Sequence, residues 1–553
     1  MSSALHQLVV AQQRDALGPA AAARSARLDD SRVQVTIKAR PGRTNTALAA
    51  VAALGGQPTA SYRDQVDAWV PVSALPALAQ QGAVVGVNLP RRPRPAVVSE
   101  GVQLVNAPAW YSAGLTGSGV KVAIVDLGFE GYTGKLGTEL PASVDTSCTQ
   151  QPLANGGPHG TAVAEIVHDV APDAQLFLVN INTDTELGQA VTCLAEKGVH
   201  VINHSIIWLY QAAGDGSGFV NQIVDDAVLH GMFWANAAGN VAHLHWRGPW
   251  SDPNNNASLN FSGSDEFQNI TVLPGDQVVI ALRWDDTWGG ACHDYDLFLW
   301  DNPDFLGSPV AWSTNVQDCS DGSEPLEWLV YNAPHDLPSG TYYIEVFRYA
   351  ATGTHTFDLL SFYHPLEYPV AAYSLEHPAD SRSAGMAAVG AVPWNNPSTL
   401  EFFSSQGPTT DGRIKPDLVA PDGVRNSVYA SFYGTSAASP HVAGAAALVN
   451  QANPSFTPAQ IRSFLQSRAI DLGPAGPDNQ FGSGRVHLGS APAGSTPTAT
   501  STGTRTPTLT PTATSTATST PSLVPSATST PTPTLTATST ATSMPTLAPT
   551  AMG

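Results

Sequence analysis

The 553-residue sequence has few charged residues, and only a minority of those are basic. Asp, Glu, Lys and Arg make up 13% of it, with 25 Lys and Arg residues against 45 Asp and Glu residues in number. The formal charge of −20 disfavours binding to nucleic acid. No run of 18 apolar residues occurs, so we expect no membrane-spanning helix.

The first thirty residues lack the apolar stretch of a secretory signal peptide. Charge is also missing from the other end, where Arg505 is the only charged residue after Ala491 and 42 of the last 63 residues are Thr, Pro or Ser. This composition is typical of a disordered stalk on an exported protein. We therefore expect a secreted or cell-surface location and a chain that lacks its natural start. No anchor follows the stalk, so the protein is either released or longer than this sequence.

Cysteine is scarce as well, with four residues at positions 148, 193, 292 and 319. None forms a Cys-x-x-Cys pair, which disfavours a zinc site. The spacing suggests a Cys292–Cys319 disulfide inside one β-rich segment, which leaves Cys148 and Cys193 as a second pair. Free buried thiols are the alternative for both pairs.

The hydrophobic pattern divides the chain into segments that differ in their predicted secondary structure. Residues 30–97 follow an undefined segment, 1–29, and show a β-α-β-β-α-β pattern that ends in a Pro- and Arg-rich linker. Residues 98–490 alternate strands with helices, as in a doubly wound, mostly parallel α/β sheet. Residues 255–365 interrupt them with short alternating strands, which predict an inserted antiparallel β-sandwich. Residues 491–553 form the stalk.

Four polar residues lie at strand ends or helix starts of the α/β segment. Asp126 ends the near-continuous apolar run Val120–Val125, and His159 opens a helix pattern. Asn240 lies in the Gly-Asn turn that follows a strand pattern beginning at Met232, and Ser436 starts an Ala-rich helix. Ser436 has an ordinary explanation as a helix cap, and Asp126 has one as a cap of the following loop. Because carboxyl ends of parallel strands share one edge of a sheet, these residues can also form one site.

Peptide-bond hydrolysis by a serine needs a histidine to accept its proton, a carboxylate to orient that histidine and donors for the oxyanion. Asp126, His159, Asn240 and Ser436 supply these groups in that chain order. Their surroundings resemble the motifs of the subtilisin-type serine peptidases. The matching stretches are His159-Gly160-Thr161, Ala238-Gly239-Asn240, Gly434-Thr435-Ser436 and Pro440-His441-Val442-Ala443-Gly444. The resemblance covers about residues 98–245 and 372–490.

The resemblance implies a role for each residue. Ser436 would attack the peptide carbonyl, His159 would act as base and then acid, and Asp126 would orient His159. Asn240 and the Ser436 backbone N–H would bind the oxyanion. The substrate would lie along Ser205, Ile206, Ile207, Ala237, Ala238 and Gly239. The 30–97 unit resembles the inhibitory propeptide of the family, and we expect self-cleavage between about Pro90 and Glu100.

Two positions depart from the family pattern. Ser205-Ile206-Ile207 stands where the family usually has Ser-Leu-Gly, so Ile207 either narrows the first specificity pocket or turns into the core. Glu165 replaces a small residue one turn after His159 and is either a surface carboxylate or a buried, paired one. The sandwich resembles the secreted pre-peptidase C-terminal type.

We expect no required cofactor. The family often carries structural calcium, but no motif here places one, and Asp285, Asp286, Asp294 and Asp296 are either calcium ligands or solvated loop residues. His168, His204, His243 and His245 have no metal-site spacing and are interpreted as structural.

The expected protein is a monomeric serine endopeptidase whose partners are polypeptide substrates and its own propeptide. The alternative is a surface binding protein in which the sandwich binds a ligand and the peptidase part is a degenerate scaffold.

Overall fold

The computed structural model describes residues 28–29, 31–88, 97–304, 307–336 and 338–492, together with Leu5, Leu8, Val9 and Gln12. The chain divides into two compact units between Pro95 and Ala96. The predicted linker from Pro90 to Pro95 and the predicted stalk after residue 492 lie outside the described residues. Within the described part of the chain, no helix is long and apolar enough to cross a membrane.

Between residues 28 and 88, the described part of the first unit consists of an antiparallel sheet with helices α3 and α4. Its elements are β1 (Leu28–Asp29), β2 (Arg32–Ala39), α3 (Thr44–Ala53), β3 (Gln57–Tyr62), β4 (Gln65–Pro71), α4 (Leu75–Ala79) and β5 (Val84–Asn88). Strand β2 pairs with β1, β4 and β5. Its alternate residues Val33, Val35 and Ile37 are fully buried and belong to one core cluster with Val51 and Leu78 of the helices. From β2 to β5 the order is β-α-β-β-α-β, as the pattern predicts.

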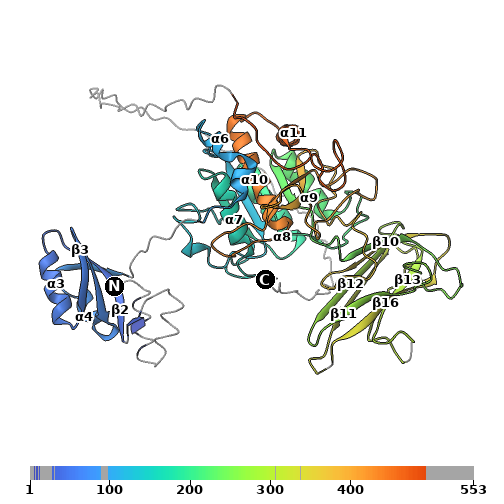
Figure 1. The fold of residues 1–553 in the computed structure, drawn as a ribbon, viewed down its shortest axis with the longest axis horizontal. Helices are drawn as coiled ribbons and strands as arrows, with labels where there is room; N and C mark the ends of the chain where they lie inside the picture. Colours follow the sequence, from blue (N-terminus) through green and yellow to red (C-terminus); the bar gives the residue numbers. More distant parts are fainter. Residues whose placement is uncertain are drawn as a thin grey trace, which may run out of the picture. The chain divides into compact units, whose positions relative to one another are not determined.

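The second unit is built on a six-stranded parallel sheet (Figure 1). The strand order is β19-β18-β9-β8-β6-β7. The strands are β6 (Lys121–Asp126), β7 (Gln175–Asn180), β8 (Val201–His204), β9 (Phe233–Ala237), β18 (Met386–Pro393) and β19 (Leu418–Asp422). Almost every strand residue is buried, because helices cover both faces.

Helices on the two faces form separate cores. They are α5 (Gly101–Val105), α6 (Ala107–Tyr111), α7 (His159–Val170), α8 (Asp184–Glu196), α9 (Phe219–Leu229), α10 (Thr435–Ala452) and α11 (Pro458–Arg468). Val122 and Ile124 of β6 share a core with α7, α10 and α11, whereas the intervening Ala123 and Val125 share the other core with α8 and α9. The doubly wound α/β architecture is therefore confirmed.

Two four-stranded antiparallel sheets lie in the chain between β9 and β18. Their orders are β10-β17-β12-β15 and β11-β16-β13-β14. The strands are β10 (His245–Pro249), β11 (Gln268–Val272), β12 (Gln277–Trp284), β13 (Asp294–Trp300), β14 (Ala311–Ser313), β15 (Leu326–Asn332), β16 (Gly340–Ala350) and β17 (Thr356–Ser361). Side chains from both sheets, including Trp284, Tyr295 and Phe357, fill one core. The first strand begins at His245, ten residues before the predicted start of the sandwich.

Both cysteine pairs form disulfides, Cys148–Cys193 and Cys292–Cys319, and among the described residues no free cysteine remains. The alternative of free thiols is therefore wrong. The sequence pattern did not predict the short helices α5 and α6, nor β10. Pro108 lies inside α6 and Pro249 ends β10, and proline weakens the pattern of either element.

Candidate active site

Asp126 and His159 meet at the carboxyl edge of the parallel sheet. Asp126 is the last residue of β6, and His159 is the first of α7. Nδ1 of His159 lies 2.8 Å from Oδ1 and 2.9 Å from Oδ2 of Asp126. Oδ1 also accepts the backbone N–H of Leu127, which fixes the carboxylate. Because the Asp126 side chain is 1% exposed and that of His159 is 34% exposed, the ring joins a buried anion to the surface.

The surroundings of His159 suit a base that works near neutral pH. Burial lowers the pKa of His159, but the charge and hydrogen bond of Asp126 outweigh this and raise that pKa above its ordinary value. The Phe432 ring contacts the imidazole edge to face, with centroids 5.4 Å apart. Gly160 allows the start of α7 to lie close to the backbone of Gly128, since a Cβ at position 160 would lie 2.7 Å from the Gly128 carbonyl oxygen.

Ser436 lies in the first turn of α10, where the helix itself provides no acceptors for the backbone N–H groups. Its hydroxyl donates to the carbonyl of Ser205 over 3.1 Å, and the Ser205 hydroxyl donates back to the Ser436 carbonyl over 3.1 Å. The two bonds join α10 to the residue that follows β8. Ser436 is partly exposed, so its hydroxyl can turn from Ser205 toward a reacting group.

Asn240 is joined to the same helix start by its amide oxygen. Oδ1 accepts the backbone N–H and the hydroxyl of Thr435, both over 2.9 Å. Because the oxygen is occupied, the Nδ2 group remains as the donor for a ligand. Thr435 in turn accepts the Gly239 N–H over 3.2 Å. Thr435 was part of a sequence motif, but nothing in the pattern predicted that it holds Asn240.

The segments predicted to bind substrate border these residues. Ala237 and Ala238 are buried, and Ala238 donates its N–H to Val389 of β18. Gly239 has a φ of +112°, and a Cβ at this position would lie 2.8 Å from Ser405 Oγ. A side chain at position 239 would therefore meet both backbone strain and a steric clash.

Ile206 and Ile207 pack in different directions. Ile206 is 9% exposed and belongs to the core with α8 and α9. Ile207 is half-buried and packs against an apolar cluster that includes Val241 and, from the inserted sandwich, Ala281 and Leu360. The sandwich therefore reaches the segment that departs from the family pattern.

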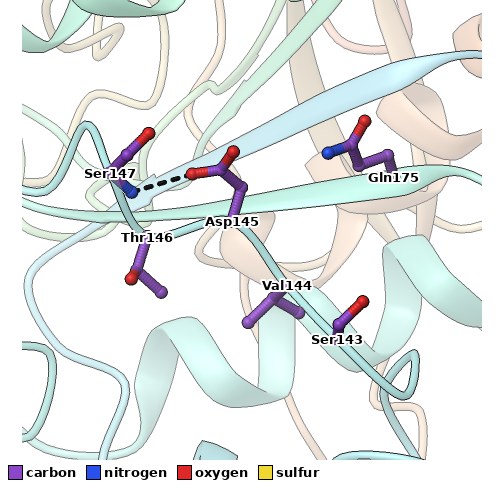
Figure 2. A pocket seen from close by; sticks show the side chains of 6 residues that line it. All are labelled: Ser143, Val144, Asp145, Thr146, Ser147 and Gln175. Atoms are coloured by element: carbon purple, nitrogen blue, oxygen red, sulfur yellow. Dashed lines mark hydrogen bonds between the residues drawn. The ribbon is translucent and has the colours of Figure 1, made fainter.

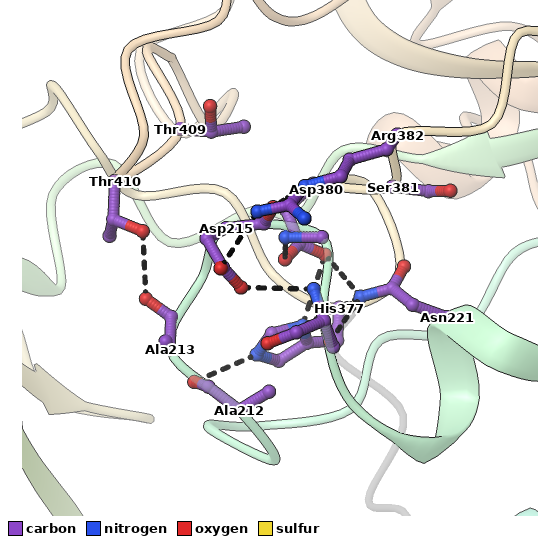
Figure 3. Close-up of polar contacts among 12 residues, drawn as sticks. Ala212, Ala213, Asp215, Asn221, His377, Asp380, Ser381, Arg382, Thr409 and Thr410 are labelled. Carbon is purple, nitrogen blue, oxygen red and sulfur yellow. Dashed lines mark hydrogen bonds and ion pairs between the residues drawn. The ribbon is translucent and has the colours of Figure 1, made fainter. Parts of the chain in front are cut away.

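A polar network fastens the next residues of that segment (Figure 3). Trp208 donates its backbone N–H to the His377 carbonyl over 2.9 Å. The buried Asp380 lies 3.0 Å from His377 Nδ1 and accepts Asn221 Nδ2 over 3.1 Å. His377 Nε2 contacts the Ala212 carbonyl over 3.3 Å. Burial raises the pKa of Asp380, but the charge and hydrogen bond of His377 reverse this and hold it well below its usual range.

Buried charges join the sandwich to the peptidase beside this network. Asp358 of β17 accepts Arg283 Nε over 3.0 Å and Arg247 Nη1 over 2.6 Å, and Arg283 Nη1 donates to the Ala212 carbonyl over 3.0 Å. His245 Nε2 lies 3.1 Å from the same aspartate, in agreement with a structural role. Single-residue patterns could not predict the cluster, because its pairs are 71 to 113 positions apart.

Glu376 is a further buried carboxyl group next to Gly239. Its backbone N–H donates to the Ala238 carbonyl, and its Cγ lies 3.5 Å from where a Gly239 Cβ would be. It is 1% exposed. Burial raises the pKa of Glu376 to about 8.

Glu165 and His204 are structural in this arrangement. Glu165 is buried and accepts the N–H and hydroxyl of Ser427 over 2.7 and 2.6 Å, so the surface-carboxylate interpretation is wrong. Burial raises the pKa of Glu165. His204 is fully buried with Nδ1 2.7 Å from Asn236 Oδ1, and burial lowers the pKa of His204 to about 4.

A shallow pocket lies away from these residues, beside β7 (Figure 2). Residues 143–147 and Gln175 line it, and Asp145 there accepts the Ser147 N–H over 2.8 Å. None of the predicted site residues lines it. Among the residues that the structure describes, no group of three or more His, Cys, Asp or Glu side chains is arranged to hold a metal ion. The four aspartates considered for calcium therefore do not form such a group.

Comparisons with known proteins identify the family to which this chain is similar. The model of the subtilase family, Peptidase_S8, matches residues 117–484. Subtilisin BL of Lederbergia lenta is 43% identical over 120 residues, which are 22% of this chain and 42% of that protein. Alkaline elastase YaB of Bacillus sp. (strain YaB) is 46% identical over 116 residues, 20% of this chain and 28% of that protein. Subtilisin E of Bacillus subtilis (strain 168) is 34% identical over 158 residues, 26% and 40%.

The matched segments thus span less than half the length of these relatives. A solved structure, the CspB protease of Clostridium perfringens, superposes with a TM-score of 0.52 at 19% identity and covers 70% of this chain and 97% of that one. At this identity the likeness concerns the fold alone.

Proposed function

Because the chain belongs to the subtilase family of serine peptidases, we propose that it hydrolyses peptide bonds in polypeptides through Asp126, His159 and Ser436. The observation that carries the proposal is the pair of contacts between His159 Nδ1 and the buried Asp126 carboxylate. These contacts leave Nε2 as the nitrogen that receives a proton. Asp126, His159, Asn240 and Ser436 all lie at the same edge of one sheet, although 310 positions separate the first from the last.

The reaction follows from these positions. The Ser436 hydroxyl turns from the Ser205 carbonyl, attacks the substrate carbonyl carbon and transfers its proton to His159 Nε2. Asp126 stabilises the imidazolium that forms. The carbonyl oxygen becomes an oxyanion, which Asn240 Nδ2 and the Ser436 N–H bind. His159 then protonates the leaving amine, the C–N bond breaks, and water releases the acyl group from Ser436 by the reverse proton transfers.

A fluorophosphonate probe tests the nucleophile directly, because it reacts with activated serines. Labelling of the mature protein should be lost in Ser436→Ala. Ser439→Ala is the matched control, since it removes a hydroxyl from the same helix, one that donates to Asn203. Failure to label the folded protein would refute the proposal and favour the alternative of a binding protein on an inactive scaffold.

The proposal extends to maturation by release of the 30–97 unit. Residues just after the linker are anchored to the peptidase: Val97 donates its N–H to Glu139 over 3.0 Å and Ser99 to Asp169 over 2.8 Å. A cut before Val97 would leave these contacts intact. Purified precursor should therefore cleave itself between about Pro90 and Glu100. Equally fast cutting of Ser436→Ala precursor, with no other protease present, would contradict self-processing.

The proposed location is extracellular, and the proposed working form is a monomer that needs no cofactor. Two disulfides support the location, because oxidised cysteine pairs persist outside the cytosol. The Thr-, Pro- and Ser-rich sequence after Ala491 supports it as well. Fractionation of the natural host, with detection in the medium and at the cell surface, tests this part independently of catalysis.

A further inference from the structure

The second sandwich sheet, β11-β16-β13-β14, turns its outer face away from the peptidase. The outer face of the other sheet packs on the peptidase, because Ala281 and Leu360 share an apolar cluster with Tyr210 and Val241. The inner faces of the two sheets meet in the sandwich core. The remaining outer face carries five aromatic residues, which we call the aromatic face: Phe298, Trp300, Trp312, Tyr343 and Phe347.

Strand register places these rings on one side. Phe298 is opposite Trp312 across β13 and β14, and opposite residues of paired strands share a face. Trp300 is opposite Tyr343 across β13 and β16. The Phe298 ring lies 6.5 Å from that of Phe347. Trp312 is 58% exposed, so its large ring is available to a partner.

Carboxylates lie between the rings on the same face. Glu345 is opposite Phe298, and Asp296 is opposite Phe347. Glu345 accepts the Ser258 hydroxyl over 2.6 Å and Trp300 Nε1 over 2.9 Å, which holds its carboxyl group beneath the aromatic surface. A cation above Trp312 or Phe298 would therefore meet both ring quadrupoles and nearby negative charge.

The part of the sandwich after β10 has the matching charge. Residues 255–365 contain sixteen Asp and Glu, two Arg and no Lys, so this segment has a formal charge of −14 out of the −20 of the chain. Both arginines are already paired, Arg283 with Asp358 and Arg348 with Asp252. The surface therefore attracts cations and repels polyanions.

We propose that the aromatic face is an exosite that binds Lys- and Arg-rich stretches of polypeptide substrates. The proposal rests on the peptidase function proposed above and adds a substrate class to it. A neutral polysaccharide could stack on the rings but would gain nothing from the negative charge, whereas a cationic peptide uses both. Binding at the sandwich would raise the local concentration of such substrates at the peptidase of the same chain.

Binding is tested on the full chain carrying Ser436→Ala, so that the probe is not cut. A labelled oligoarginine peptide should bind, and added salt should weaken the binding. A further Trp312→Ala or Phe298→Ala should raise Kd about threefold to thirtyfold, the range expected for a lost cation–π contact. The control is Tyr363→Ala, which removes a 39% exposed ring outside the aromatic face and should leave Kd unchanged.

Equal affinity in Trp312→Ala and its parent would overturn the proposal, as would preference for oligoglutamate or for an insoluble polysaccharide. Trp312→Phe keeps a ring and should restore most of the affinity, which separates ring loss from local unfolding. On the active chain, Trp312→Ala should lower kcat/KM for a basic protein but not for a short uncharged peptide. Failure of fluorophosphonate labelling would affect the peptidase proposal alone, because the binding assay uses the inactive variant.

Discussion

Replacing Asn240 by alanine should lower kcat by about 10²–10³ with little change in KM. In subtilisin, the loss of one oxyanion-hole donor has this effect, and we carry that magnitude over rather than derive it. The structure supports the transfer, because both bonds from Thr435 end on Oδ1 of Asn240. The amide is thereby fixed with Nδ2 as its available donor. A donor that acts on the oxyanion stabilises the transition state more than the bound substrate, which is why kcat changes and KM does not.

Two companion variants test the reason for the effect. Asn240→Asp keeps the shape of the side chain but replaces the donor by a carboxylate, so its kcat should be at least as low as that of Asn240→Ala. Thr435→Val removes the hydroxyl that donates to Asn240 and accepts from Gly239, while the backbone bond to Oδ1 remains. Its loss should be intermediate, about tenfold, because one of two positioning bonds survives.

The assay is hydrolysis of a chromogenic peptide, with active-site concentration determined by fluorophosphonate titration. Titration matters because it separates misfolding from a slower reaction. A misfolded variant would lose titratable Ser436 as well as rate. Asn240 and Ser436 lie on separate segments, so a folded Asn240→Ala variant keeps the serine that is titrated. The reasoning is refuted if Asn240→Ala retains more than a tenth of the parental kcat, or if KM rises while kcat is preserved. Either result would mean that the Asn240 amide does not face the developing oxyanion.

Three further outcomes are expected. Because His159 must be neutral to act as base and Asp126 raises its pKa, the acid limb of kcat/KM should lie above the ordinary histidine value of about 6.5, and Asp126→Asn should move it down in a pH–rate profile. Cys148→Ser should lower the free energy of unfolding by about 4 kcal/mol in urea titrations, since the disulfide with Cys193 spans 45 residues; an unchanged midpoint would refute this. Glu376 has a pKa of about 8 in the folded state, above the value of 4.5 in the unfolded state. Its protonated form therefore contributes to the free energy of unfolding below pH 4.5, and this contribution is lost as the pH rises toward 8. Glu376→Gln should make the free energy of unfolding depend less on pH over that window.

Local sequence patterns predicted the strands and helices that have an unbroken hydrophobic pattern. The apolar run before Asp126 and the helical run after Ser436 each specify one buried element, and chain order then placed four polar residues at one edge of the sheet. β10 shows the limit of this reasoning. His245-Trp246-Arg247-Gly248-Pro249 has no regular alternation, and it is a strand because Leu360 to Thr356 of β17 pair with it.

The contacts that position the site were harder to predict than the site residues. Thr435 holds Asn240 across 195 positions, and Arg283 holds Asp358 across 75. Nothing in the neighbourhood of either residue indicates its partner, because such pairs depend on how distant elements pack. The same applies to Glu376, whose burial beside Gly239 arises only when the segment after the sandwich returns to β9.

The return of the chain from the sandwich to the parallel sheet explains how so large an insertion can lie in the sequence between Asn240 and Ser436. β9 and β18 are parallel neighbours, with Trp234 opposite Met386 and Ala237 opposite Val389. Parallel neighbours always need a long crossover connection, so the sandwich lengthens a connection that the fold requires anyway. Loop-closure entropy grows only with the logarithm of length, and the sandwich core supplies its own stability. The inserted strands therefore need not strain the hydrogen bonds from Thr435 to Asn240.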